Sequence, residues 1–453
     1  MTRTTMLAGL LLVIAAAPVA AQAGVTLYSD GRVLVRRTLP IQVPQGTSVH
    51  RLALGPLDPG SVFSLDPDLF ITGTSFDAAV DEANTMRRAI GRKLVFETGG
   101  RTNGVLDTVV AEVLGVEPER VRLADGRILF ARPGRPRYPD DLVQLAPTLA
   151  VGVRSTAPRN TLSLGYFTDG ASWSAAYQVI LARGVARITG QAVMPSQRLS
   201  VDDADVQLLA GDIGAARPAS PYAARMMESK MAADAVGGVA AEQQIGESHL
   251  YSLPGRLTLR PGVTTTAALF EQTTAPWERV YTVRGQVPWY GPLGQDGGEN
   301  KQPVEVHYLI KRPRPSEFGD RPLPAGGWRI YEADASGRLQ LVGEAGTGHS
   351  AAGQDLRLAA GTAFDLTATR VQTDYAIRRD STRTIATAGY RVTLANAKDS
   401  VVSVDVLEER RGEWRILESS LPAEKLSSTQ TRFRIRVPAR GEAVLTYRVR
   451  VVW

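Results

Sequence analysis

Cysteine is absent from this chain of 453 residues, and histidine occurs only four times. Without cysteine there can be no disulfide, no thiolate nucleophile and no cysteine-bound zinc. The histidines, His50, His249, His307 and His349, are separated by tens of residues. No two of them have the spacing of metal ligands on one element. The sequence therefore predicts no cofactor and no metal site.

Long apolar runs are also missing after the first residues. Residues 1–23 combine a basic Arg3, an apolar run at 6–17 and small residues at 21–23, which is typical of an export signal cleaved before Gly24. The alternative is an uncleaved membrane anchor, but this run is shorter than the roughly 20 residues needed to span a bilayer. We therefore expect an exported protein, periplasmic or on the outer cell surface, with no transmembrane segment in the mature chain.

Lysine is scarce, so most of the positive charge is carried by arginine. The formal net charge is +6, and cleavage of the signal would remove one arginine and leave +5 (6 − 1). An excess this small, spread over the whole length, is a weak indication of a polyanionic partner. We expect no nucleic acid partner.

What the chain does contain is many short runs of alternating apolar residues, separated by turn residues. Glycine and proline number 43 and 27, and valine and threonine are common, which favours strands and turns. We predict a mainly β fold of antiparallel meander and sandwich domains, with a small barrel-like subdomain and a long flexible insertion. The predicted parts are a signal peptide (1–23), an N-terminal β domain with the barrel-like subdomain (24–140), a central β-meander (141–212), a flexible Ala/Met-rich linker (213–248) and a C-terminal β-sandwich (249–453).

The clearest pattern lies at residues 162–181. Two alternating runs flank a turn at 168–170, where Gly170 can adopt a positive φ. We expect a β-hairpin at the centre of a four-strand meander, with Trp173 and Tyr177 as buried core residues.

Other turns predict local structure nearer the start. Residues 29–31 and Asp125-Gly126 each join two apolar-rich runs, as in a hairpin. Asn84 is a candidate cap for a short helix that Gly91 would end. In the linker, Met227 and Met231 leave open a short amphipathic turn that docks on a partner.

Motifs for catalysis or phosphate binding are incomplete. Residues 343–350 match a phosphate loop except that His349 replaces the lysine, and we expect a glycine turn between strands there. The glycine-rich stretch at 291–300 lacks the register of a calcium loop. The carboxylate pairs 202–203 and 408–409 are adjacent, so on a strand their members point to opposite faces and form no dyad.

A charged pattern at the C-terminus is more specific. Arginines alternate with apolar residues in the last two strand-like runs, so they would share one exposed face if the two runs pair. This predicts a ladder that binds an anionic envelope polymer. The alternative is a solvated outer face with Glu408 or Glu418 opposite the arginines. The candidate polyanion-binding residues are Arg432, Arg434, Arg436, Arg448 and Arg450.

The alternation continues to Trp453, as it does in the last strand of an outer-membrane barrel. The few aromatic residues, which make up 6% of the chain, and the lack of regular strands of about ten residues argue against that alternative.

Several stretches together resemble a bacterial family of exported proteins, the domain-of-unknown-function family number four-one-three-nine, described as mucoidy inhibitor A-like. The similar stretches are 162–177, 205–212, 249–262 and 323–345 followed by 361–366. The resemblance implies a β-rich envelope protein with no assigned reaction and no catalytic residues to transfer. Some relatives carry a coiled coil between N-terminal strands, whereas this chain offers at most a short helix there.

Taken together, the sequence predicts an exported β-rich envelope protein that acts as a binding or structural component. The expected partner is an envelope protein or an anionic polysaccharide. The alternative is an enzyme, a carboxylate-dependent hydrolase acting on an envelope substrate. A cleft that gathers carboxylates with strongly shifted pKa values would favour the enzyme.

Overall fold

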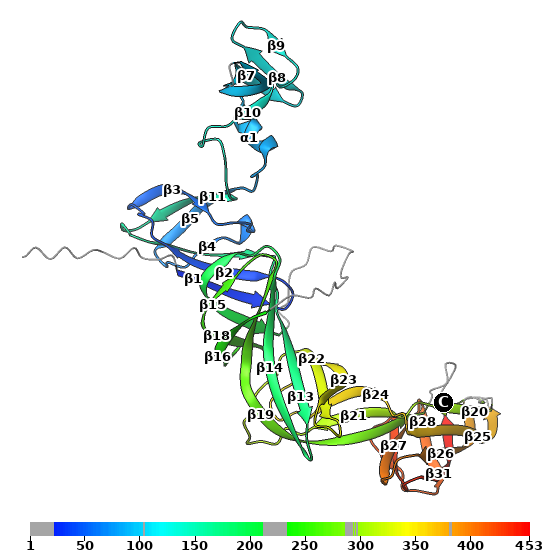
Figure 1. The fold of residues 1–453 in the computed structure, drawn as a ribbon. Helices are drawn as coiled ribbons and strands as arrows, with labels where there is room; N and C mark the ends of the chain where they lie inside the picture. The colour runs from blue at the N-terminus through cyan, green and yellow to red at the C-terminus, as the bar shows by residue number, and fades with distance from the viewer. Residues whose placement is uncertain are drawn as a thin grey trace, which may run out of the picture.

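The computed structural model describes residues 22–102, 105–211, 233–285, 293, 295, 298–379 and 383–453. This part of the chain is mainly β, with 64% strand and a single α-helix. Figure 1 shows an extended arrangement of sheets, in which a small unit with α1 lies at one end and the C-terminal strands lie at the other. The predicted fold class is therefore confirmed at the level of a mainly β protein.

A seven-stranded sheet begins the fold. Its strands in spatial order are β17 (Ala241–Ile245), β18 (Ser248–Leu259), β15 (Val201–Ala210), β1 (Gln22–Tyr28), β2 (Val33–Leu39), β12 (Leu162–Thr168) and β4 (Phe63–Ser64). β1 and β2 form the predicted hairpin, and Gly31 between them has a φ of 90°. β15 runs parallel to β1, so this sheet is mixed.

A three-stranded sheet comes next along the molecule. Its strands are β3 (Gly46–Ala53), β11 (Thr148–Ser155) and β5 (Leu69–Asp77), and a short 3-10 helix, η1, covers Pro59–Ser61. Leu149, Val151 and Val153 alternate along β11 and are fully buried, because successive side chains of a strand point to opposite faces.

A small unit is inserted between β5 and β11. It holds α1 (Glu82–Arg88) and a five-stranded sheet ordered β10 (Arg135–Arg137), β6 (Lys93–Thr102), β7 (Val105–Val116), β8 (Glu119–Leu123) and β9 (Ile128–Leu129). β8 and β9 form the hairpin predicted at Asp125-Gly126. The barrel-like subdomain expected here is an open sheet, because β10 and β9 lie at opposite edges among the described pairings.

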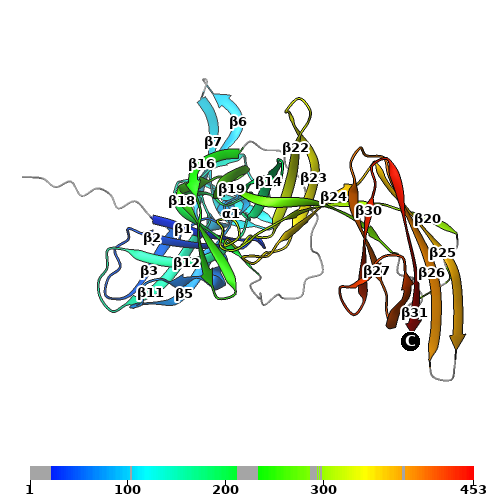
Figure 2. The ribbon, with the colours of Figure 1, turned by 90° about the horizontal axis from the view of Figure 1, so that it is seen from below.

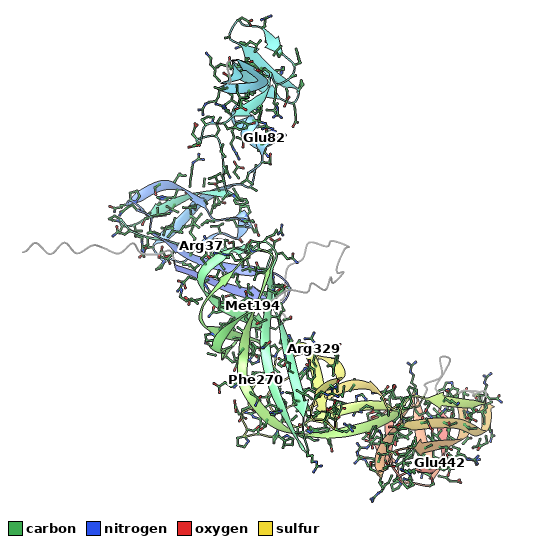
Figure 3. The ribbon with its side chains drawn as sticks, in the orientation of Figure 1. Arg37, Glu82, Met194, Phe270, Arg329 and Glu442 are labelled. Carbon is green, nitrogen blue, oxygen red and sulfur yellow. The ribbon has the colours of Figure 1, made fainter. Side chains whose placement is uncertain are left out.

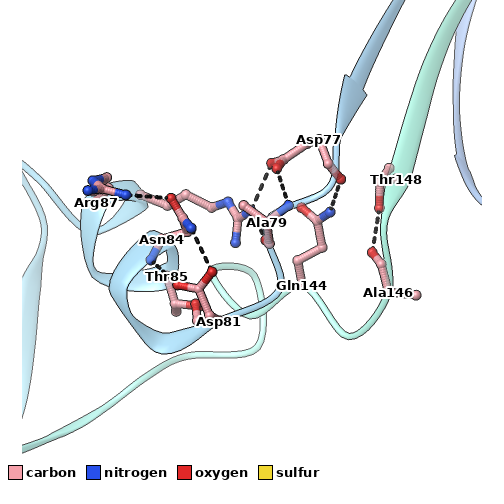
Figure 4. Close-up of polar contacts among 10 residues, drawn as sticks. Asp77, Ala79, Asp81, Asn84, Thr85, Arg87, Gln144, Ala146 and Thr148 are labelled. Carbon is pink, nitrogen blue, oxygen red and sulfur yellow. Dashed lines mark hydrogen bonds and ion pairs between the residues drawn. The ribbon is translucent and has the colours of Figure 1, made fainter. Parts of the chain in front are cut away.

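Hydrogen bonds at the neck of the inserted unit fix how it leaves the sheet (Figure 4). The carboxylate of Asp77 accepts from the Ala79 amide at 3.0 Å and from Arg88 at 2.8 Å, and its carbonyl accepts from Gln144 at 2.8 Å. Asp81 caps the start of the helix, and its side chain accepts from the amide of Asn84 at 2.9 Å. The sequence predicted Asn84 as the cap, but the cap is Asp81, because the helix starts three residues earlier than predicted.

A long sheet occupies the middle of the molecule. Its main order is β23 (Leu339–Thr347), β22 (Gly326–Ala333), β13 (Ser174–Leu181), β14 (Val185–Ser196), β19 (Val263–Arg284), β27 (Val402–Glu409), β30 (Gln430–Val437) and β29 (Glu424–Lys425). Three further strands pair outside this order: β16 (Ala233–Val239) and β21 (Glu305–Ile310) pair with β19, and β24 (Leu356–Thr362) pairs with β21. Met194 and Phe270, labelled in Figure 3, are buried in its core.

β19 is the strand that connects the middle of the molecule to the C-terminal unit. It pairs with β14 through Pro276, with β21 from Trp277 and with β27 from Tyr281. Its 22 residues extend over about 70 Å at the usual rise of a strand. Figure 2, seen from below, likewise places the C-terminal strands away from β1 and β2.

The C-terminal unit has two sheets that face one another. One is the end of the long sheet, with β27 and β30, and the other is β20 (Glu299–Gln302), β25 (Leu366–Arg379), β26 (Thr384–Asn396), β31 (Gly441–Val452) and β28 (Glu413–Ser419). Phe433 on β30 and Tyr447 on β31 belong to the same core, with ring centroids 5.0 Å apart. The two sheets therefore enclose one apolar layer.

Three cores hold the described residues together. The first draws residues from Ala23 to Leu358, the second from Tyr281 to Val451 and the third from the inserted unit, Met86 to Leu142. One core thus unites residues from the predicted N-terminal, central and C-terminal parts.

The predicted hairpin at residues 162–181 is wrong. β12 pairs with β2 and β4, whereas β13 pairs with β14 and β22, in a different sheet. Gly170 does have a positive φ of 91°, and its carbonyl accepts from the amide of Gln197 at 2.7 Å. The turn therefore passes the chain from one sheet to the next. Of the expected four-strand meander, only β13 and β14 are neighbours.

The predicted flexible linker is replaced by strands in its second half. Residues 213–232, with Met227 and Met231, lie outside the described residues. From Ala233 onward the chain forms β16, β17 and the start of β18. Alanine-rich composition hid these strands, whose partners are β19 and β18.

Candidate functional site

Trp173 and Tyr177 are packing residues. They are 4% and 1% exposed. The indole N–H of Trp173 donates to the Leu209 carbonyl at 3.1 Å, and the hydroxyl of Tyr177 donates to the Pro324 carbonyl at 2.8 Å. Burial raises the pKa of Tyr177 above its ordinary value, so the phenol stays protonated. Trp173 thus bonds to β15 of the seven-stranded sheet and Tyr177 to the segment before β22, and the polar group of each side chain is used in a structural hydrogen bond.

The C-terminal arginines do not form the single ladder that the sequence predicted. β30 pairs with β27 and β29, and β31 pairs with β26 and β28, so the two runs lie in different sheets. Apolar residues of both strands point into the shared core. Their arginines must therefore point out of opposite sides of the unit.

On the β30 side, two of the predicted arginines are held by carboxylates. Arg432 lies 2.6 Å from Glu424 and 3.6 Å from Asp405, and Arg434 lies 2.8 Å from Asp405. This partly matches the alternative of a solvated, paired outer face, although the acids are Asp405 and Glu424. Arg436 is exposed on the same side.

The outer side of the other sheet carries more arginines, and we call it the arginine face. It is defined by the outward-facing residues Arg391, Arg415, Arg448 and Arg450 on β26, β28 and β31. All four side chains belong to exposed residues. Sequence reasoning missed Arg391 and Arg415. Each alternates with buried or half-buried neighbours, but nothing in the sequence says that their strands flank β31.

One row of residues across the arginine face explains why position 389 is a glycine. Asp374, Gly389, Arg448 and Glu418 lie side by side across β25, β26, β31 and β28. Arg448 reaches over Gly389 to Asp374, with 2.9 Å between Nη2 and Oδ2. A Cβ on Gly389 would lie 2.2 Å from that carboxylate oxygen. The missing side chain therefore makes room for the ion pair.

Beside this row the surface is hollowed. A cavity of about 460 Å³ opens there, and it is polar because arginine, acidic and hydroxyl side chains line it. Its lining residues are Thr373, Asp374, Gly389, Tyr390, Arg391, Glu418, Ser419, Ser420, Thr446, Tyr447 and Arg448. Positive groups next to several hydroxyls suit a ligand that combines negative charge with many hydroxyl groups.

A buried ionic cluster lies beneath the cavity. Glu408, Arg370 and Arg410 are 1%, 4% and 2% exposed. Glu408 accepts from Arg370 at 3.3 Å and lies 2.8 Å from Arg410, and Arg410 donates to the hydroxyl of Tyr447 at 3.2 Å. The guanidinium of Arg370 lies 3.7 Å from the ring centroid of Tyr390. Tyr390 and Tyr447 thus belong both to this cluster and to the cavity lining.

Glu408 is ionised in this setting. Burial alone would raise its pKa, but the charges of Arg410 and Arg370 and the hydroxyl of Tyr447 lower the pKa below the ordinary value. Of the two glutamates in the alternative of a solvated outer face, Glu418 is the register partner of Arg448, whereas Glu408 is buried. It shares its face of β27 with Val404 and Val406, which point into the core.

A second cavity, of about 480 Å³, lies at the end of β12. It is lined by Arg32, Pro56, Leu57, Asp58, Phe167, Thr168 and Asp169. Its two carboxylates already have structural partners, because Asp58 accepts from the Gly60 amide at 3.0 Å and Asp169 lies 2.7 Å from Arg198. The partners of both carboxylates are thus structural, and this cavity gives no support to the alternative of a hydrolase.

Shifted carboxylate pKa values also fail to indicate a hydrolase. Among the described residues, every carboxylate with a clear shift has a lowered pKa; these are Asp30, Asp77, Asp81, Asp125, Asp141, Glu305, Asp320, Asp334 and Glu408. Hydrogen bonds from Ser336 and Gln340 lower the pKa of Asp334 to about 2, for example. A general acid needs the opposite shift.

The remaining sequence motifs are structural where the structure describes them. Residues 343–347 lie in β23, paired with β22, so the expected glycine turn is a strand. Nδ1 of His349 accepts from the Ala325 amide at 3.2 Å. Half of the glycine-rich stretch at 291–300, which lacks the register of a calcium loop, lies outside the described residues. Within them, no three His, Asp or Glu side chains gather as metal ligands, and no helix has the length and apolar character to cross a bilayer.

Comparison with known proteins adds no relative. No protein-family model matches the chain, and no curated protein is significantly similar to it. The resemblance to the family of exported proteins therefore stays a prediction from the sequence.

Proposed function

We propose that the chain is an exported envelope protein with a binding role, and that its C-terminal unit binds an anionic envelope polymer. The observation that carries the proposal is the arginine face with its polar cavity, at one end of an extended molecule (Figure 1). Arginine is suited to this task because its planar guanidinium binds carboxylate and phosphate groups with two parallel hydrogen bonds.

The C-terminal unit has the form that such a role needs. We infer that it is a β-sandwich domain, since two facing sheets share one core. The buried cluster of Glu408, Arg370 and Arg410 lies under the arginine face and helps to hold its strands in place. Binding groups on rigid strands keep their geometry without a cost for ordering.

The proposed location follows from the export signal at residues 1–23, which the family resemblance supports. Cell fractionation tests it: we expect the mature protein in the periplasm or on the cell surface, starting at Gly24. Recovery of the full chain from the cytosol would contradict the proposal.

Binding is tested with the purified mature protein. We expect it to bind polygalacturonate, an acidic polysaccharide, and to ignore neutral dextran of matched length. Added salt should weaken the interaction, because salt screens the attraction between exposed charges. The screening length is about 8 Å at physiological ionic strength and shortens as salt is added. Equal affinity for the acidic and neutral polymers would contradict the proposed function.

A further inference from the structure

Two arginines of the arginine face lie directly opposite one another. Arg415 on β28 and Arg450 on β31 are register partners in an antiparallel pair, so their Cβ atoms are about 4.5–5.5 Å apart. Thr387 lies next in the row, on the other side of Arg450. Among the described residues, neither Arg415 nor Arg450 has a carboxylate within ion-pair distance.

Such a pair is unfavourable in the free protein. Like charges directly opposite on neighbouring strands repel and destabilise a sheet. In the adjacent row the charge of Arg448 is balanced, because Arg448 forms an ion pair with Asp374 and lies opposite Glu418. An anion placed between Arg415 and Arg450 would relieve the repulsion and accept hydrogen bonds from both guanidinium groups.

The neighbouring residues limit the kind of anion. Asp374 and Glu418 lie one row away and would repel a polymer with dense negative charge. The same carboxylates can accept hydrogen bonds from uncharged hydroxyls, as can the hydroxyl groups of Ser420 and Thr446 in the cavity. The surroundings suit a chain with one carboxylate per sugar and many free hydroxyls.

We infer that Arg415 and Arg450 form a clamp for the carboxylate of an acidic polysaccharide, whose neighbouring sugar lies in the cavity beside Arg391 and Arg448. This inference rests on the proposed function and names its binding residues and ligand class. No covalent step is involved.

The test compares two double variants of the mature protein. Arg415→Gln/Arg450→Gln removes the clamp, and Arg432→Gln/Arg436→Gln removes the same charge from the opposite side of the unit. With polygalacturonate as the probe, the clamp variant should bind at least tenfold more weakly than the parent. The control variant should bind like the parent. Arg415→Lys/Arg450→Lys should fall between, because lysine keeps the charge without the planar fork.

Stability gives a readout that needs no ligand. Without bound polymer, the clamp variant should melt at the temperature of the parent or above it, because a repulsion has been removed. Parent-like binding by the clamp variant overturns the inference and leaves the proposed function intact. A parent that does not prefer polygalacturonate to dextran overturns the proposed function itself.

Discussion

The indole of Trp173 fills the core and also satisfies a buried carbonyl. Its N–H donates to Leu209 at 3.1 Å, and its ring lies 6.3 Å from that of Tyr251. Glu408 serves the C-terminal core differently, through charge. Single residues thus stabilise the two halves of the protein by packing in one and by an ionic cluster in the other.

Removal of the Trp173 ring should destabilise the protein strongly. Trp173→Ala leaves a cavity and an unpaired carbonyl, and should lower the free energy of unfolding by roughly 3–5 kcal/mol. Trp173→Phe keeps most of the ring volume and should cost less. Urea unfolding followed by circular dichroism measures both. Stability of the alanine variant equal to the parent would mean that the ring is not buried.

Glu408 should make stability depend on pH. Its pKa is lower in the folded protein than in the unfolded chain, so its contribution is complete above the unfolded value of about 4.3. That contribution is lost as the pH falls through the lower folded value. Thermal melts between pH 7 and pH 3 should therefore show a loss of stability at the acid end.

The variant Glu408→Gln isolates this effect. It leaves Arg370 and Arg410 buried without their carboxylate partner, which should cost about 3–5 kcal/mol at pH 7. Its stability should also fall less on acidification than that of the parent. Glu409→Gln, on the exposed neighbour, is the matched control. Identical melts for both variants at pH 7 would contradict the assignment.

At the scale of elements, partner choice distinguishes the observed fold from the expected one. β13 lies between β14 and β22, and the pairing with β22 is parallel. β12 lies in another sheet, beside β2. Parallel neighbours need long connections, and here the connection from β13 to β22 exceeds a hundred residues of chain.

Engineered disulfides can test this arrangement cleanly, because the chain has no cysteine of its own. Gln178 and Arg329 are exposed register partners on β13 and β22, and neighbouring strands bring Cα atoms within disulfide range. Gln178→Cys/Arg329→Cys should form a disulfide on mild oxidation, seen by mass spectrometry.

The matched control pairs Gln178 with Ser163, its approximate partner in the hairpin that the sequence predicted. Ser163→Cys/Gln178→Cys should stay reduced. A disulfide in this variant and none in the first would support the predicted hairpin and contradict the pairing of β13 with β22.

The sequence predicted strands and turns better than it predicted neighbours. Gly31 and Gly126 mark real hairpins, since each connects two strands that pair with one another. Gly170 has the same conformation but joins different sheets. Alternation showed which arginines point outward. Whether β30 pairs with β31 depends on long-range packing, so the candidate site could not be assembled from the sequence.

At the scale of the whole molecule, the cores are largely separate. The first core reaches Ala275 on β19, and the second begins at Tyr281 on the same strand. Val306 packs against both. An extended array of this kind holds the arginine face away from the first sheet (Figures 1 and 2).

Calorimetry should resolve these cores as separate unfolding steps. We expect at least two transitions for the mature protein, because each core is buried by its own sheets. Glu408→Gln should lower only the transition of the C-terminal unit, and Trp173→Ala only that of the first core. A single transition that shifts as a whole in both variants would contradict this expectation.

The continuous strand β19 sets a limit on how the protein can be divided. Proteins built from domains on flexible linkers can lose or exchange a domain when the chain is cut in a linker. Here a break just before Tyr281 would separate β21 from the β19 residues Trp277 to Val280 with which it pairs, and a break after Val283 would remove Tyr281 and Val283 from the second core. Fragments for expression, and fusions to other binding proteins, should therefore keep residues 263–284 in one piece.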